Sequence, residues 1–345
     1  MELRNDPPDS SALPGVSIIM STYNEKHWLS ETIAAVLGQS DASLEFLIID
    51  DASTDGTRAL LAGYDDPRLL IFRHDQRNGW LNNMNLLASR ARGKLLKFLC
   101  PDDVMKPGCN EAALSLYQAR PDAGYIVCDF EWIDERGRIA ARQSIPDYPR
   151  IIPPQLADDI ALVDGCFANT SCLFVPRDKW LEVGGMREVV QPNPERWPTV
   201  EDYDLMVRLQ ERYPVGYIRE PLVAVRTHSQ QVQANPRVRP MLTQANLEVL
   251  RMVWERRDRT RPELASDTRA KVRRRLAREY FNPAVKALLR KQWSTAIAQI
   301  RIVSAMLPLR DILFVWLKEV IGPALGRRAA TLFPWRHGSA PQAGR

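Results

Sequence analysis

The sequence predicts an α/β protein whose core is a mostly parallel β-sheet flanked by helices on both faces. From residue 16 to about 130, short apolar stretches alternate with amphipathic ones, as is typical of parallel strands joined by helices. Polar side chains follow the apolar stretches, and such sheets bind their ligands at the carboxyl ends of the strands. After residue 238 the pattern predicts helices only.

Each apolar stretch of the first region predicts a strand. Strands are expected at 16–22, 44–50, 69–74, 94–99 and 124–130, with helices that end near 38, begin near 55 and cover 80–91 and 107–119. From residue 131 the rhythm changes. The sequence there predicts a hairpin at 131–143, a proline-rich loop at 145–154, a short strand at 171–175, a helix leading to Gly184, a helix opened by Glu201, and two strands at 215–220 and 222–228.

Length and charge divide the 345 residues into parts. We expect a flexible tail at 1–14, the α/β domain at 15–237, a basic helical region at 238–333 and a disordered end at 334–345. Residues 240–345 hold 21 Lys and Arg against 8 Asp and Glu, a net charge of +13, whereas residues 1–239 hold 26 against 34, or −8. The basic part is therefore treated as a separate unit.

The cysteines and the apolar segments indicate a cytoplasmic protein. The five cysteines are an odd, scattered set without a Cys-x-x-Cys pair, which argues against a disulfide framework and a structural zinc site. Residues 1–15 are acidic and lack the apolar run of a secretory signal. No uncharged stretch reaches the roughly 20 residues that spanning a membrane requires.

The ends of the first two strands carry candidates for a nucleotide site. Asp50 and Asp51 end the second strand, and adjacent like charges there need a compensating partner such as a base N–H, a ribose hydroxyl or a cation. We favour Asp51 and leave Asp50 open. The segment after the first strand offers Thr22, the aromatic ring of Tyr23 and the carboxylate of Glu25, a plausible shelf for a nucleobase.

Two acidic pairs far apart in the sequence carry the predicted chemistry. Asp102 and Asp103 follow an apolar strand, where they could hold Mg²⁺ or Mn²⁺ beside a diphosphate or else cap a helix. Glu201 and Asp202 open a helix whose dipole stabilises ionised carboxylates, so they are candidates for a catalytic base, with helix capping as the alternative. Asp204 is expected to pair with an arginine such as Arg208.

These segments together resemble a known family. VSIIMSTYNE, LIIDDASTDGT, ASRARGKLLKFLCPDD, the Gly184–Gly185 turn and VEDYDLMVRL have the order and approximate spacing seen in family 2 of the inverting glycosyltransferases, which have the GT-A fold. The resemblance covers about residues 15–232. In one respect the chain departs from the family pattern: Cys100 stands where the first acid of the Asp-x-Asp metal motif is usual, and we expect it to be a small buried side chain.

The resemblance implies a transferase that moves a sugar from a nucleoside diphosphate sugar, with UDP favoured, to a hydroxyl of a glycan or lipid-linked acceptor in polysaccharide or glycolipid synthesis. It implies that Thr22, Tyr23, Glu25 and Asp51 bind the nucleoside, that Asp102 binds the cation and that Asp202 is the base. The alternative, motivated by Cys100, is a catalytically silent sugar-nucleotide-binding or scaffold protein. Nucleotidyl transfer ranks last, because STYNEKHW contains no glycine.

The resemblance adds further candidates. An Arg-x-His pair, Arg226 and His228, is expected to face the diphosphate, with His228 a metal ligand or a phosphate contact. Weaker candidates for the donor site are Arg77, Asn78 and Asn85, and for a sugar platform Trp80 and Trp197.

The basic C-terminal helices leave several partners open. An anionic membrane surface, on the inner face of the cytoplasmic membrane, is one alternative, and packing on the α/β domain or on a second subunit is the other. Nucleic acid is not expected, because aromatic residues are not interleaved with the arginines.

Overall fold

The computed structural model describes most of the chain. The described residues are 2–3, 13–40, 43–143, 148–165, 168–189, 199–232, 235, 238–260 and 266–318. The chain forms two compact units, Met1–Val253 and Trp254–Arg345, and each is described by itself.

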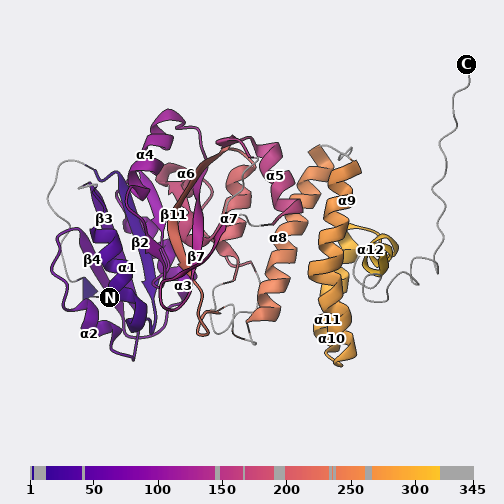
Figure 1. Ribbon diagram of the computed structural model, residues 1–345, viewed down its shortest axis with the longest axis horizontal. Coiled ribbons are helices and arrows are strands. Elements are labelled where there is room, and N and C mark those ends of the chain that lie inside the picture. The colour runs from indigo at the N-terminus through magenta and orange to yellow at the C-terminus, as the bar shows by residue number, and fades with distance from the viewer. Residues whose placement is uncertain are drawn as a thin grey trace, which may run out of the picture. The chain divides into compact units, whose positions relative to one another are not determined.

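The first unit is built on one sheet, which has eleven strands among the described residues (Figure 1). Its path runs β1-β4-β3-β2-β5-β10-β7-β11-β6, with β8 paired to β7 and β9 to β11. The strands are β1 (Glu2–Leu3), β2 (Val16–Thr22), β3 (Leu44–Asp51), β4 (Leu69–His74), β5 (Leu95–Phe98), β6 (Val104–Met105), β7 (Tyr125–Ile133), β8 (Ile139–Gln143), β9 (Ile151–Ile152), β10 (Phe174–Pro176) and β11 (Val215–Arg226).

Strand direction decides which loops meet. β2, β3, β4 and β5 are parallel neighbours, and β7 is parallel to β11. β10 lies between β5 and β7 and is antiparallel to both, so its beginning lies at the edge where those strands end. The carboxyl ends of six strands and the amino end of β10 therefore share one edge of the sheet.

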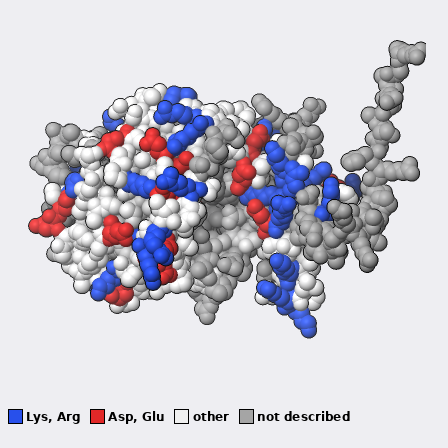
Figure 2. All heavy atoms as spheres, viewed as in Figure 1, with Lys and Arg blue, Asp and Glu red and all other residues white. Residues whose placement is uncertain are grey.

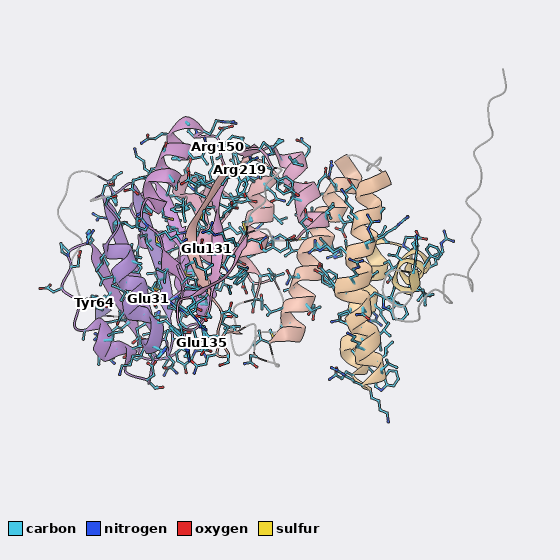
Figure 3. All side chains as sticks on the ribbon, in the orientation of Figure 1. Glu31, Tyr64, Glu131, Glu135, Arg150 and Arg219 are labelled. Atoms are coloured by element: carbon cyan, nitrogen blue, oxygen red, sulfur yellow. The ribbon has the colours of Figure 1, made fainter. Side chains whose placement is uncertain are left out.

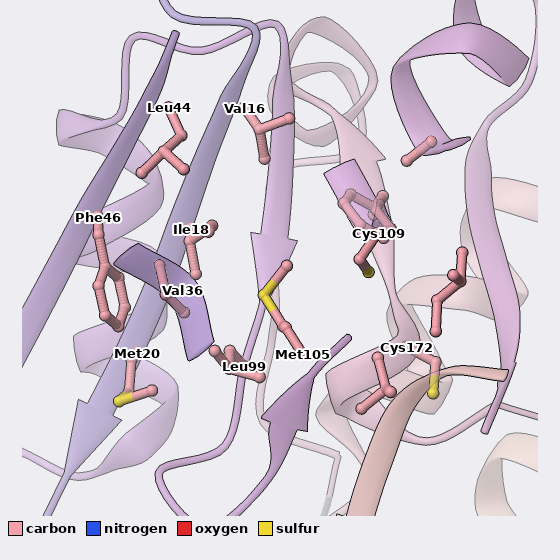
Figure 4. Close-up of a cluster of buried hydrophobic side chains, with 14 of the residues drawn as sticks. Val16, Ile18, Met20, Val36, Leu44, Phe46, Leu99, Met105, Cys109 and Cys172 are labelled. Carbon is pink, nitrogen blue, oxygen red and sulfur yellow. The ribbon is translucent and has the colours of Figure 1, made fainter. Parts of the chain in front are cut away.

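The helices of the first unit pack on the sheet. They are α1 (Lys26–Leu37), α2 (Thr57–Leu61), α3 (Trp80–Arg90), α4 (Cys109–Ala119), α5 (Pro154–Val163), α6 (Arg177–Glu182), α7 (Glu201–Gln210) and the start of α8 (Arg239–Thr260), with a short 3₁₀ turn, η1, at Thr170–Cys172. Alternate residues of β2 and β3 point to one face of the sheet and pack against α1 there. Figure 4 shows Val16 and Ile18 of β2, Phe46 of β3 and Val36 of α1 in this cluster. This buried layer fixes the strand ends that carry the polar residues.

The predicted alternation of strands and helices is confirmed, with three corrections. The short strand expected at 171–175 begins only at Phe174, because Thr170–Cys172 form the turn η1. The two strands expected at 215–220 and 222–228 are one strand, β11, whose register shifts between Ile218 and Val223. Pro221, which separates the two expected strands, lies at this irregularity, where the missing backbone N–H is tolerated. The expected proline-rich loop contains β9 and leads into α5, which begins at Pro154, because proline suits the first turn of a helix.

The second unit is helical where described, as expected. It holds the end of α8, then α9 (Ser266–Arg275), a π-helical segment (Leu276–Phe281), α10 (Asn282–Leu289), α11 (Trp293–Met306) and α12 (Leu309–Trp316). Phe281 and Trp316 pack edge to face at 5.6 Å between ring centroids, and Arg273 pairs with Asp311 at 3.1 Å. None of the described helices is both long and apolar enough to cross a bilayer.

Candidate functional site

The loops after β2 and β3 are joined by hydrogen bonds at the shared edge. Asn24, with φ of 58°, donates its backbone N–H to Ser53 Oγ at 2.9 Å, and its side-chain oxygen accepts from the Thr54 N–H at 2.7 Å. Ala52 also has a positive φ, 65°. Two non-glycine residues in this sparsely populated region mark the turns as constrained by their surroundings. Asp50 accepts from the Ser53 N–H at 3.1 Å, a local turn contact.

Asp51 is buried and anchors the loop before α3. Its two carboxylate oxygens accept the backbone N–H groups of Asn78 and Gly79 at 2.8 and 3.0 Å. Arg77, in the same loop, lies with its guanidinium 4.0 Å from the centroid of the Tyr23 ring. The structure thus brings Asp51, Arg77, Asn78 and Tyr23 together, and it compensates the Asp51 charge with backbone donors. A role of these residues in nucleotide binding stays a prediction.

Thr22, the last residue of β2, has a buried hydroxyl whose Oγ1 has no hydrogen-bond partner among the described residues. Buried hydroxyls are nearly always paired, so the Thr22 hydroxyl is a group that a ligand at this edge could engage.

Asp102, His228 and Glu25 form a second group at this edge. His228 Nε2 lies 3.0 Å from Asp102 Oδ2, and this contact raises the pKa of His228. Burial, together with the charge of Asp102, raises the pKa of Glu25 to about 7. Three elements distant in sequence therefore converge here, and the predicted proximity of His228 to the Asp102 pair is found.

Asp103, the neighbour of Asp102, is almost fully buried. Ser171 Oγ donates to its Oδ2, and the backbone N–H of Arg226 donates to its Oδ1 at 2.8 Å. Burial and the neighbouring Asp102 charge raise the pKa of the Asp103 carboxyl well above its usual range. Its oxygens are thus engaged by the protein, and a metal-binding role for Asp103 stays a prediction.

Asp202 reaches the same place from α7. Thr170 Oγ1 donates to its Oδ2, and the Tyr203 N–H donates to its Oδ1 at 2.8 Å. Burial raises the pKa of Asp202, and these two donors oppose the shift. Glu201 instead accepts the N–H and hydroxyl of Thr199, two residues before it, at 2.7 and 2.8 Å, and burial raises its pKa to about 7. Its catalytic role stays a prediction.

The turn η1 links the two acidic pairs. Its neighbouring hydroxyls, Thr170 and Ser171, donate to Asp202 and to Asp103 respectively. The Cys100 thiol lies in the same neighbourhood: burial first, and then the charges of Asp103 and Asp102 with a smaller part from Asp202, raise its pKa well above the usual range. The Cys100 thiol is therefore protonated, and Asp102, Asp103 and Asp202 lie near enough for their charges to affect its pKa.

The group formed by Cys100, Asp102 and Asp103 could hold a cation. One ligand atom from each lies within 4.8 Å of the others. A protonated thiol is a poor ligand for a hard cation, and Asp103 is already engaged, so Asp102 is the natural ligand. Its Oδ2 contacts His228, and no described residue donates a hydrogen bond to its Oδ1. This set fits Mg²⁺ or Mn²⁺ held by one or two carboxylates plus substrate phosphates.

Arg226 is buried and its guanidinium contacts several segments of the site. Its guanidinium donates to the backbone oxygens of Asp102 and Glu135 and to the Glu31 carboxylate at 2.6 Å, and it stacks 4.4 Å from the Trp28 ring centroid. Figure 3 shows Glu31 on α1 and Glu135 after β7 at the same end of the sheet. The Arg226 side chain is 1% exposed and its N–H groups donate to protein acceptors, so it joins helix α1 to the loops after β5 and β7. A contact with the sugar nucleotide stays a prediction.

Other predicted residues are placed less centrally. The Asn85 amide exchanges two hydrogen bonds with the Met186 backbone, at 2.9 and 3.0 Å, beside the Gly185 turn. Donor binding by Asn85 therefore stays a prediction. Asp204 pairs with Arg208 at 2.7 Å, as predicted, and also with Arg187. Trp80 begins α3, and Trp197 lies outside the described residues.

Sequence reasoning missed Lys97, Thr170 and Ser171. Lys97 is a fully buried lysine in β5; its ammonium donates to the Ser171 carbonyl and lies 4.2 Å from the Phe174 ring centroid. A lysine inside an apolar strand is a signal that could have been noticed, because buried lysines need partners. Thr170 and Ser171 gave no such signal, since only the antiparallel entry of β10 brings them to the site.

The sheet order and the acid-bearing edge define a protein of the GT-A fold. The structure of S. aureus TarS 1–349 in complex with UDP-GlcNAc shares this fold, with a TM-score of 0.60 and 15% identity over 86% of this chain and 82% of that chain. The profile described as Glycosyl transferase family 2 matches residues 17–182 of the 345, in agreement with the resemblance of the motifs.

Curated relatives agree with this family. An uncharacterised glycosyltransferase of Rickettsia felis is 26% identical over 234 residues, 67% of this chain and 37% of the relative. The Escherichia coli UDP-Glc:alpha-D-GlcNAc-diphosphoundecaprenol beta-1,3-glucosyltransferase WfgD is 27% identical over 196 residues, 56% of this chain and 69% of that protein. The chain thus spans well under half the length of the Rickettsia relative.

Proposed function

We propose that the protein transfers a glycosyl group from a nucleoside diphosphate sugar to a hydroxyl of a glycan or lipid-linked acceptor, with inversion at the anomeric carbon. The observation that carries this proposal is the pair of neighbouring hydroxyls in η1. Thr170 and Ser171 bring Asp202 into the neighbourhood of Asp102 and Asp103, where a base and a diphosphate-binding group are needed together.

Asp202 is the proposed general base. Its carboxylate takes the proton of the acceptor hydroxyl while that oxygen bonds to the anomeric carbon and the bond from this carbon to the diphosphate breaks. The electron pair of that bond leaves with the nucleoside diphosphate. Burial raises the pKa of Asp202, which strengthens it as a base, and the Thr170 and Tyr203 donors keep its oxygens in place.

The donor side uses the first three loops. Tyr23, backed by Arg77, offers a flat face for a nucleobase, and the unpaired Thr22 hydroxyl and the Glu25 carboxyl lie at the same strand end. Asp51 shapes this pocket by holding the loop at Asn78 and Gly79. A UDP-sugar is the favoured donor, since the TarS structure holds UDP-GlcNAc.

The cation is proposed to be Mg²⁺ or Mn²⁺, with Asp102 as its main ligand and Asp103 and His228 beside it. When bound, it would offset the negative charge that builds on the departing diphosphate.

Release of nucleoside diphosphate from a panel of nucleotide sugars tests the proposal. Asp202→Asn should lower turnover by about 10²- to 10⁴-fold, because the base is lost while the side-chain shape stays. Asp178→Asn is the control, since this carboxylate is 65% exposed on α6. Binding of a nucleotide sugar, seen as a thermal shift, without turnover of any donor by the unchanged protein would favour the silent binding protein instead.

The acceptor is proposed to be lipid-linked, by analogy with the diphosphoundecaprenol acceptor in the name of the E. coli relative. We therefore propose that the reaction takes place at the inner face of the cytoplasmic membrane. Radiolabelled sugar recovered in the organic phase with an undecaprenyl diphosphate sugar, but in the aqueous phase with a free glycan, separates the two acceptor classes.

A further inference from the structure

The turn between α10 and α11 exposes apolar side chains at one end of the second unit. Leu289 is 80% exposed, Trp293 58% and Ile297 45%. Trp293 and Ile297 are four residues apart on α11, so they share a face, and Leu289 ends α10 next to the turn. The opposite faces of the hairpin are buried through Ala284, Ala287, Ala296 and Val303. The exposed side chains are therefore surplus to the packing of the unit.

Basic residues surround these apolar ones. Lys286 is exposed on α10, and Arg290 and Lys291 are exposed in the turn that follows it. Lys291 has a φ of 60°, a conformation that favours glycine, yet a lysine occupies it. Residues 280–310 contain five Lys and Arg and no Asp or Glu. Figure 2 shows Lys and Arg at the lower end of the C-terminal helices.

We propose that this hairpin tip, comprising Lys286, Leu289, Arg290, Lys291, Trp293 and Ile297, inserts into the interface of an anionic lipid bilayer. A tryptophan with aliphatic neighbours suits the boundary between headgroups and acyl chains, and the cations match anionic headgroups. The lack of Asp and Glu in residues 280–310 favours an anionic membrane over a protein partner, because an anionic surface repels carboxylates, whereas a protein surface can pair with both signs of charge. The proposal is independent of the glycosyl-transfer reaction.

Vesicle co-sedimentation of the full chain tests it. We expect binding to vesicles that contain phosphatidylglycerol and at least about tenfold weaker binding to pure phosphatidylcholine, since each cation near an anionic surface adds attraction. Leu289→Ser with Trp293→Ala should weaken binding to the anionic vesicles by at least about tenfold. Replacing Lys286, Arg290 and Lys291 by Gln should do the same and should remove the preference for anionic lipid.

Matched controls come from the first unit. Ile139→Ser with Leu181→Ser removes two side chains of similar exposure, 57% and 55%, and Arg136→Gln with Arg138→Gln removes two exposed cations. These variants should bind vesicles as the unchanged protein does. Unaltered vesicle binding by the tip variants, with unaltered melting temperature, would overturn the proposal. So would a change of oligomeric state in light scattering without any change in vesicle binding, because the tip would then contact a second copy.

Discussion

The two acidic pairs, Asp102–Asp103 and Glu201–Asp202, have the same internal arrangement. In each, one carboxylate is almost fully buried and accepts a hydroxyl and a backbone N–H: Asp103 is 2% exposed and Glu201 1%. The other, Asp102 or Asp202, is partly exposed at the sheet edge. Two adjacent acids can therefore divide their tasks, because one anchors the loop and the other stays accessible at the sheet edge.

The strongest test of this division replaces Lys97, the buried lysine of β5. Lys97→Met should lower the free energy of unfolding by about 3 kcal/mol, because the Ser171 carbonyl loses the buried ammonium that donates to it and the Asp103 carboxyl loses a favourable positive charge. Urea denaturation measures the effect. The double variant with Asp103→Asn should be less destabilised than the sum of the single variants. Additive effects would mean that Lys97 supports the strand and not the acidic pair.

A second test compares the members of the first pair directly. Asp103→Asn should lower the free energy of unfolding by about 2 kcal/mol, since an amide cannot accept from both Ser171 and Arg226. Asp102→Asn should change it by less than about 1 kcal/mol and should instead remove the stabilisation by Mn²⁺ with a nucleotide sugar in thermal-shift measurements. Equal losses of stability would refute the division of tasks.

The anchor of the second pair should show in the pH dependence of stability. The pKa of Glu201 is raised to about 7 from its usual value of 4.5, so the folded protein keeps this proton to a higher pH than the unfolded chain does. Its contribution to stability therefore declines as pH rises from about 4.5 to 7. Between pH 5.5 and 8 the unchanged protein should lose about 2 kcal/mol relative to Glu201→Gln. Parallel stability curves would show that Glu201 does not titrate in this range.

The smallest expected effect concerns the hydroxyl that orients the accessible member. Thr170→Val should lower turnover about tenfold, because Asp202 loses one donor, and Thr170→Ser should restore most of it. Steady-state kinetics should place the loss in kcat rather than in KM. A loss that Ser fails to restore would point to packing of the methyl group instead.

Local sequence was enough to predict the sheet and the loops that carry the acids. The strand and helix spacing from Val16 onward located Asp51, Asp102 and Asp202 at element ends, because each follows or opens a run with a clear period. Thr170 and Lys97 could not be assigned in this way, since their partners come from strands that pair only in the folded sheet. The irregularity at Pro221 also depends on tertiary pairing.

The antiparallel course of β10 has a consequence for how this protein could be switched off. The strand begins at the sheet edge just after Thr170 and Ser171 and runs away from that edge, so its register fixes both hydroxyls at once. A single residue inserted just ahead of Phe174 would leave the sheet with its full set of strands while both carboxylates lost their donors together. The site would then be misassembled in a protein that still folds, a lesion that abundance measurements alone would overlook.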